Sequence, residues 1–216
     1  MSTSTSALST RAAVVVALLA AAYVAAQVLA DVSSLRLVDL FGKAIDGGTF
    51  IYPITFTLRD LIHKTAGKKV ARAVIVAAAV VNLAMAGLFW LVSELPLVAD
   101  SGPASELFAD VLGPVWRIVL ASIVAEVIAE LIDTEVYSAW VKRFGADKQW
   151  GRVLVSNAAA LPIDSALFAF IAFAGIVPGS IVWEIIYLNI LFKGVVTVLS
   201  IPLIYAVKPN MVVTDG

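Results

Sequence analysis

Residues 73–93, AVIVAAAVVNLAMAGLFWLVS, form an apolar run without a single charged side chain. A helix rises about 1.5 Å per residue, so roughly 20 mostly apolar residues cross the hydrocarbon core of a bilayer. The whole chain shares this character, because 61% of its 216 residues are hydrophobic and only 14% are charged. Soluble domains contain about 45–50% apolar and about 25% charged residues. The sequence therefore predicts an integral membrane protein.

Further candidate spans lie on both sides of this run, at Ala12–Ala30, Thr49–His63, Leu112–Ser138, Val153–Gly175 and Ile181–Val207. The second span is short and is interrupted by Arg59 and Asp60. Because the connecting segments are short, we expect an all-α bundle of six transmembrane helices in a single domain over residues 12–207. A disordered polar N-terminus (residues 1–11) precedes it, and a cytoplasmic tail (residues 208–216) follows.

The distribution of Lys and Arg predicts the orientation, because short positively charged loops stay in the cytoplasm. With the N-terminus inside, ten basic residues fall on the cytoplasmic side: Arg11, Lys64, Lys68, Lys69, Arg72, Lys142, Arg143, Lys148, Arg152 and Lys208. The outer segments hold only Arg36 and Lys43. Both termini are therefore expected in the cytoplasm. The alternative is that a signal peptide within the Ala-rich run up to Ala30 is cleaved. Cleavage would leave five spans and remove the asymmetry of Lys and Arg between the two sides of the membrane.

Ionisable side chains at membrane depth are costly and commonly functional. Glu126, Glu130 and Asp133 share one stripe of the fourth predicted span, and Ser122 extends that stripe outward. We expect this acidic stripe to face the interior of the bundle, since lipid cannot solvate it.

The remaining spans carry further polar side chains. Asn157 and Asp164 lie two turns apart on the fifth span, and Asn189 and Lys193 lie one turn apart on the sixth. Lys193 is the only cation expected deep in the membrane, so it should pair with Asp164 or with the acidic stripe. Gly67 is expected to be a close-packing point.

The acids among these membrane-depth residues outnumber the bases, whereas simple pairing between helices would need near neutrality. The excess acid implies protonated carboxylates, a bound cation, or a wet cavity that holds a polar ligand. The chain has no cysteine and one histidine, and it contains no H-E-x-x-H, G-x-S-x-G, phosphate-binding or dinucleotide-binding motif. We therefore expect no enzyme activity, no metal and no cofactor, although a paired-carboxylate intramembrane hydrolase stays open. The nearly balanced charge argues against nucleic-acid binding.

Four segments carry a resemblance to a known family. They are FIYPITFTLRDLIHKTAGKKVAR (50–72), WRIVLASIVAEVIAELIDTEVY (116–137), SNAAALPIDSALFAFIAF (156–173) and LFKGVVTVLSIPLIY (191–205). Together they resemble the VUT family of queuosine precursor transporters, of the YhhQ type. The resemblance implies a six-span importer of 7-cyano-7-deazaguanine or a related 7-deazaguanine. It points to Asp60, Arg117, Asp133, Asp164 and Lys193, and the chain departs from the family pattern at Arg59 and Glu130.

The polar residues suit such a ligand. A guanine-like ring has adjacent N–H donors for a carboxylate and a carbonyl for a cation or an amide. We expect Asp164 or a stripe residue (Glu126, Glu130 or Asp133) to accept from the donors, and Lys193 or Asn157 to donate to the carbonyl.

An aromatic ring such as Phe168 or Tyr187 should stack on the ligand. Asp60, Arg59, Arg72 and Arg117 are expected to act in gating or in ion pairs. Two alternatives stay open: the substrate-binding subunit of an energy-coupling-factor vitamin importer, and a proton or cation channel. The oligomeric state does not follow from the sequence.

Overall fold

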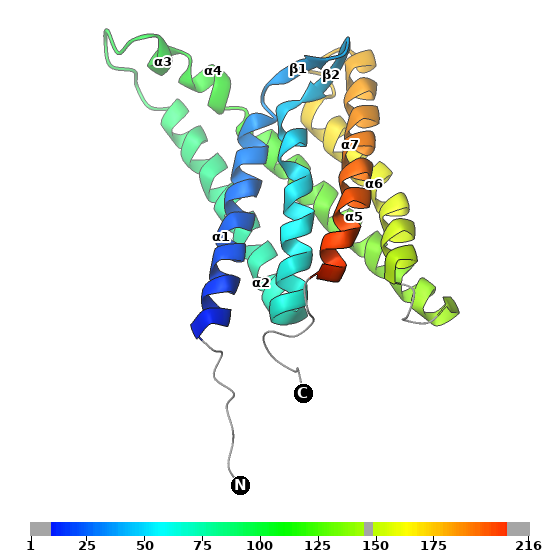
Figure 1. The fold of residues 1–216 in the computed structure, drawn as a ribbon. Coiled ribbons are helices and arrows are strands. Elements are labelled where there is room, and N and C mark those ends of the chain that lie inside the picture. The colour runs from blue at the N-terminus through cyan, green and yellow to red at the C-terminus, as the bar shows by residue number, and fades with distance from the viewer. Residues whose placement is uncertain (1–9, 145–148, 207–216) are drawn as a thin grey trace.

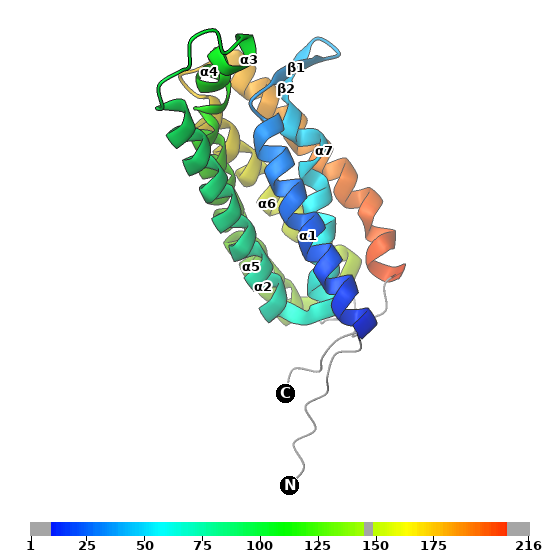
Figure 2. The same ribbon diagram turned by 90° about the vertical axis from the view of Figure 1, so that its left-hand side faces the viewer.

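The computed structural model describes residues 10–144 and 149–206. The N-terminal residues 1–9 and the tail expected at 208–216 lie outside the described residues. Long helices run along one another and form an elongated bundle (Figures 1 and 2). The elements are α1 (Thr10–Ser33), β1 (Leu37–Leu40), β2 (Lys43–Asp46), η1 (Gly47–Phe50), α2 (Tyr52–Ser93), α3 (Pro103–Glu106), α4 (Phe108–Leu112), α5 (Val115–Phe144), α6 (Gln149–Phe173) and α7 (Gly179–Ala206).

Helix α2 consists of two helical halves that meet at Gly67. This residue has φ +82° and ψ 169°, a conformation that favours glycine because side chains on L-residues clash there. The first half (residues 52–66) runs away from the β-hairpin, and the second half (residues 68–93) returns (Figure 1). Gly67 is thus the point at which the chain reverses, and the prediction of a close-packing point misses this role.

Within residues 10–144 and 149–206, five helical segments are long and apolar enough to cross a membrane: Ala13–Ser33, Lys69–Ser93, Phe108–Ala129, Leu154–Phe173 and Gly179–Leu199. They match five of the predicted spans and confirm a multi-pass membrane protein. The first half of α2 corresponds to the remaining span, but it is shorter and more polar, as Arg59 and Asp60 indicated. Six membrane crossings therefore stay a prediction.

The two ends of the bundle differ in structure. The β-hairpin and the short helices α3 and α4 lie at one end, which we call the hairpin end (Figures 1 and 2). The start of α1, the bend at Gly67 and the ends of α5 and α7 lie at the opposite end, which we call the basal end. Lys69, Arg72, Lys142 and Arg143 all belong to segments at the basal end. This grouping is the one that the charge distribution predicts for a cytoplasmic face.

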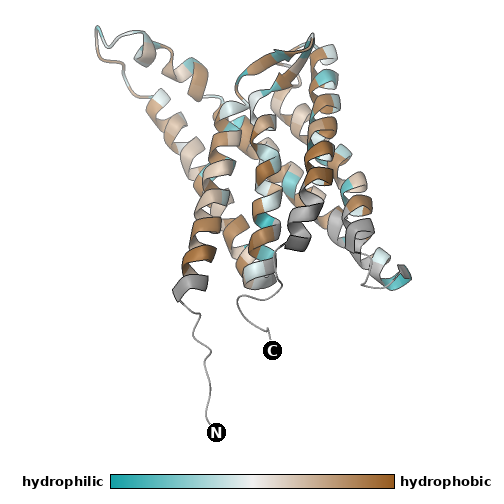
Figure 3. Ribbon diagram, in the orientation of Figure 1, coloured by the Kyte–Doolittle hydropathy of each residue, from teal (hydrophilic) through white to brown (hydrophobic). Residues whose placement is uncertain are grey.

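Apolar residues dominate the helices (Figure 3), and many of them are exposed, as expected for surfaces that contact lipid. The largest buried cluster joins α5, α6 and α7 near the hairpin end. Small residues at its centre, Ala121 and Ala125 on α5 and Ala169 and Ala172 on α6, are almost fully buried. Small side chains let helix backbones approach closely, which is how helices associate in a bilayer.

The β-hairpin departs from the all-α prediction. Strands β1 and β2 pair antiparallel, with Leu37 opposite Asp46 and Leu40 opposite Lys43. Glu184 of α7 accepts a 2.8 Å hydrogen bond from the backbone N–H of Ala44, which ties β2 to the bundle. The hairpin thereby delivers Asp46 into the interior, where it is 1% exposed.

Candidate functional site

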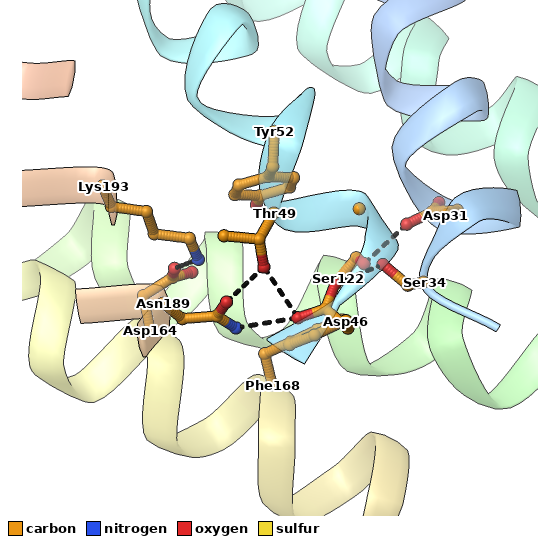
Figure 4. A pocket seen from close by; sticks show the side chains of 11 residues that line it. Asp31, Ser34, Asp46, Thr49, Tyr52, Ser122, Asp164, Phe168, Asn189 and Lys193 are labelled. Carbon is orange, nitrogen blue, oxygen red and sulfur yellow. Dashed lines mark hydrogen bonds and ion pairs between the residues drawn. The ribbon is translucent and has the colours of Figure 1, made fainter. Parts of the chain in front are cut away.

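A polar hollow opens inside the hairpin end of the bundle, with about 290 Å³ of space between the surrounding atoms, including the part that is open at its mouth. We call it the hairpin-side hollow (Figure 4). It is lined from α1, β2, η1, α2, α5, α6 and α7 by Asp31, Ser34, Asp46, Gly48, Thr49, Tyr52, Ser122, Asp164, Phe168, Asn189 and Lys193. Segments far apart in the sequence therefore meet around one polar site inside an apolar bundle.

Lys193 and Asp164 form an ion pair within this hollow. The Lys193 Nζ atom lies 2.5 Å from Asp164 Oδ2, and both side chains are 3% exposed. The same ammonium lies 4.4 Å from the centre of the Tyr52 ring, within cation–π distance. The predicted pairing of Lys193 with Asp164 is confirmed. An ammonium has three N–H donors, so this pairing leaves donors for a ligand.

Asp46 lies at the centre of a network that joins the hairpin to α1, η1 and α7. Its Oδ1 accepts from the Ser34 hydroxyl at 2.8 Å, and its Oδ2 accepts from Thr49 at 2.8 Å and from Asn189 Nδ2 at 3.1 Å. The Thr49 hydroxyl also contacts the Asn189 amide oxygen. Both oxygens of Asp46 therefore have hydrogen-bond donors, as the oxygens of buried carboxylates usually do.

Gly48 allows η1 to approach α1 closely enough for this network to form. A Cβ atom at position 48 would lie 2.0 Å from the Ser34 hydroxyl and 2.6 Å from the Ala30 carbonyl oxygen. A side chain at this position would push η1 away from α1, so the glycine is required by packing.

Asp31, at the end of α1, is 2% exposed and also faces the hollow. Its Oδ1 accepts a 2.6 Å hydrogen bond from Ser122 of α5, whereas its buried Oδ2 has no hydrogen-bond partner. Each ionised carboxylate oxygen can accept more than one hydrogen bond. Asp31 therefore has spare acceptor capacity at the wall of the hollow.

Aromatic rings flank these polar groups. Tyr52 of α2 and Phe168 of α6 lie on opposite sides of them in Figure 4. Phe168 thus lies where the sequence hypothesis expects a stacking ring. Tyr187, the other ring considered for that role, is 59% exposed and does not line the hollow. On α7 it is Asn189 and Lys193 that face inward.

A second hollow lies nearer the basal end, with about 340 Å³ of space. We call it the basal-side hollow; it is lined by Phe56, Arg59, Glu126, Ala129, Asn157, Ala160, Leu161 and Asp164. Asp164 belongs to both hollows and marks the boundary between them. The polar interior therefore extends along the bundle on both sides of the Lys193–Asp164 pair.

Glu126, the first acid of the predicted stripe, contacts α1. Its Oε1 accepts a 2.9 Å hydrogen bond from the Tyr23 hydroxyl, and Gln27 Nε2 lies 3.4 Å from Oε2. Gln27 also donates to the Tyr23 oxygen at 3.0 Å. The stripe thus faces the interior at Glu126 and Ser122, as expected.

The other predicted residues fall into three groups. Asn157 and Arg59 line the basal-side hollow, and the Arg59 guanidinium lies 5.3 Å from the centre of the Phe56 ring. The side chains of Asp60, Glu130 and Asp133 lie outside the described part of the chain. The remaining two, Arg72 and Arg117, line neither hollow.

Arg117 has a different place from the one expected for a gating residue. Its Nε donates to the Ile171 carbonyl at 2.7 Å and its Nη2 donates to the Ala174 carbonyl at 2.5 Å. These carbonyls belong to the C-terminal end of α6, which favours a positive charge. Arg117 therefore caps α6, and Arg72 is exposed on α2.

Sequence reasoning missed six residues that line the hairpin-side hollow: Asp31, Ser34, Asp46, Gly48, Thr49 and Tyr52. Asp31 served only as the boundary of the first span, although α1 continues to Ser33 and buries it. The sequence signal available for Asp31 was that this acid directly follows the apolar run of the first span. The other five lie in or beside the hairpin and η1, and hydropathy does not predict the tertiary contacts of these segments.

Comparisons with known proteins agree on one family. Residues 46–207 match the family described as "Putative vitamin uptake transporter". The chain is 29% identical over 189 residues to a "Probable queuosine precursor transporter" of Bacillus subtilis (strain 168), covering 85% of this chain and 80% of that protein. No solved structure matches the chain at a significant level.

Proposed function

The chain belongs to the "Putative vitamin uptake transporter" family, and from this premise we propose that it imports a queuosine precursor, 7-cyano-7-deazaguanine or a related 7-deazaguanine. It is a multi-pass protein of the cell membrane, and the described part of the chain contains five helices long and apolar enough to span a bilayer. The similarity to a protein named as a queuosine precursor transporter supports the substrate class. The basic residues at the basal end support a cytoplasmic position for that end.

The hairpin-side hollow is the observation that carries the proposal. In an apolar bundle it gathers carboxylates, an amide, an ammonium and two aromatic rings, of which Asp164, Lys193 and Phe168 are examples. A flat heterocycle with donors on one edge and a carbonyl beside them needs this combination. We assign its carbonyl to the spare N–H donors of Lys193 and its ring faces to Tyr52 and Phe168.

Transport uses both hollows in turn. The substrate enters the hairpin-side hollow, and the basal-side hollow with Arg59, Glu126 and Asn157 lies on its path to the cytoplasm. Because Asp164 lines both, breaking and remaking its pair with Lys193 is the step that connects them. This assigns Asp164, Lys193, Asn157 and Glu126 to substrate binding and Arg59 to release.

The test uses cells that cannot make the precursor and lack their own importer. With the chain expressed and 7-cyano-7-deazaguanine supplied outside at low concentration, queuosine should appear in transfer RNA. Asp110→Asn, a change at an exposed carboxylate on α4, should behave like wild type. Absence of queuosine with the protein inserted in the membrane would overturn the proposal.

The purified chain alone in liposomes separates the alternatives. Accumulation of labelled 7-cyano-7-deazaguanine without other subunits supports a self-sufficient transporter. Uptake in cells but none in liposomes would indicate dependence on a partner ATPase complex. Ion currents without purine flux would indicate a channel.

A further inference from the structure

Three carboxylates line the hairpin-side hollow, and they differ in what they already bind. Asp164 pairs with Lys193 at 2.5 Å. Asp46 accepts hydrogen bonds on both oxygens from side chains of three elements. Among the described residues of this lining, only Asp31 has a fully buried oxygen, Oδ2, without a hydrogen bond.

An unpaired buried carboxylate oxygen is unfavourable, since it has left water without gaining a new donor. Most buried polar atoms in native proteins do find a partner. Ser122 fixes Asp31 through Oδ1 at 2.6 Å, so the side chain is held in place while Oδ2 remains available. Asp31 is thus a fixed carboxylate whose side chain lines the hollow and has an oxygen without a hydrogen bond.

We propose that Asp31 is the specificity-determining residue that reads the donor edge of the substrate. This rests on the proposed function and replaces, as a proposal, the expectation that Asp164 or a member of the acidic stripe does so. The exocyclic amino group of a 2-aminopyrimidinone ring donates to Asp31 Oδ2. The neighbouring ring N–H donates to Oδ1, which keeps a second lone pair beside its hydrogen bond from Ser122.

The arrangement across the hollow fits this assignment. Asp31 and Lys193 lie at opposite sides in Figure 4, with Tyr52 and Phe168 on the other two sides. A flat ring between the aromatic side chains therefore presents its donor edge to Asp31. Asp31 thus selects rings that carry the amino group over rings that lack it.

The experiment compares two probes on purified protein: 7-cyano-7-deazaguanine and its analogue without the exocyclic amino group. Since a hydrogen bond to a charged group contributes about 1.5–3 kcal/mol, wild type should bind the amino-bearing probe roughly 10-fold to 100-fold more tightly. Asp31→Asn, which has nearly the same shape, should lose most of that preference. Asp31→Glu, which keeps the carboxylate, should retain a preference with weaker binding.

Two further variants control for indirect effects. Ser122→Ala should weaken the preference partly, because it frees the Asp31 side chain without removing its charge. Asp110→Asn should leave binding and preference unchanged. A full preference in a folded Asp31→Asn protein would overturn the role of Asp31 and leave the proposed function intact. A wild-type protein that binds neither probe would overturn both.

Discussion

The Lys193 ammonium and the Asp164 carboxylate meet at 2.5 Å where the two hollows join. Helices α6 and α7 each contribute one member, so the pair fixes the two helices relative to each other. Because each charge is buried, each depends on the other for stability. A substrate that competes for either charge therefore acts on the packing of both helices, which links binding to movement.

Replacing one member of this ion pair should destabilise the protein more than replacing both. Lys193→Met or Asp164→Asn alone should abolish uptake and lower the free energy of unfolding by about 3–5 kcal/mol, because an uncompensated group stays buried. The double variant should recover much of that stability but no uptake. Thermal unfolding in detergent and uptake in cells measure the two effects separately. Wild-type uptake by the double variant would show that the pair is only structural.

The pair itself was predictable from the sequence, and the residues around it were less so. A lone cation at mid-membrane depth must find an acid, and Asp164 lies at similar depth on the neighbouring helix. No comparable rule places Asp46, because it enters the interior through the β-hairpin. Hydropathy assigns residues 31–48 to a loop, and it does not predict which tertiary contacts the residues of a loop make.

Two further differences between the sequence predictions and the structure, at Arg117 and Gly67, have the same cause. The resemblance pointed to Arg117, but nothing in the sequence places the carbonyls at the end of α6 within its reach. Gly67 looked like any small residue in a helix, since only the backbone dihedral angles distinguish a reversal from a packing point. Sequence reasoning located the long helices and the Lys193–Asp164 pair, and tertiary contacts decided the roles of Arg117 and Gly67.

The hydrogen bond from Tyr23 to Glu126 should be structural. Tyr23→Phe removes the 2.9 Å donor and keeps the ring, so the free energy of unfolding should fall by about 1.5–3 kcal/mol, as for a hydrogen bond to a charged group. Affinity for 7-cyano-7-deazaguanine should stay within a few-fold of wild type, because Tyr23 lines neither hollow. Chemical denaturation and equilibrium binding are the measurements. A large loss of affinity at unchanged stability would contradict this assignment.

Arg117 should contribute to stability through the end of α6 rather than through gating. Arg117→Gln loses a charge-assisted cap on two carbonyl groups and should lower the free energy of unfolding by about 1–2 kcal/mol. Arg117→Lys should restore part of that loss, since the charge returns without the planar fork of donors. Arg72→Gln, at an exposed arginine, is the matched control and should have little effect. Lost transport at full stability in Arg117→Gln would restore the gating hypothesis.

The bend at Gly67 should tolerate no side chain. Gly67→Ala forces an L-residue into φ +82° and should lower the free energy of unfolding by roughly 1–3 kcal/mol. Gly87→Ala is the matched control, because a Cβ at that position meets nothing within 4 Å and the residue is helical. It should be neutral or slightly stabilising. Equal effects of the two changes in thermal unfolding would argue against a backbone requirement at Gly67.

The orientation of the bundle can be tested directly because the chain contains no cysteine. A single cysteine introduced by Lys43→Cys lies at the exposed turn of the hairpin, and one introduced by Lys69→Cys lies exposed next to the basal bend. If the basic end faces the cytoplasm, a membrane-impermeant maleimide should label the first variant in intact cells. It should label the second only after the membrane is opened. The reverse pattern would invert the proposed topology, and labelling of both positions in intact cells would contradict a membrane crossing by the first half of α2, the helical segment that lies between them.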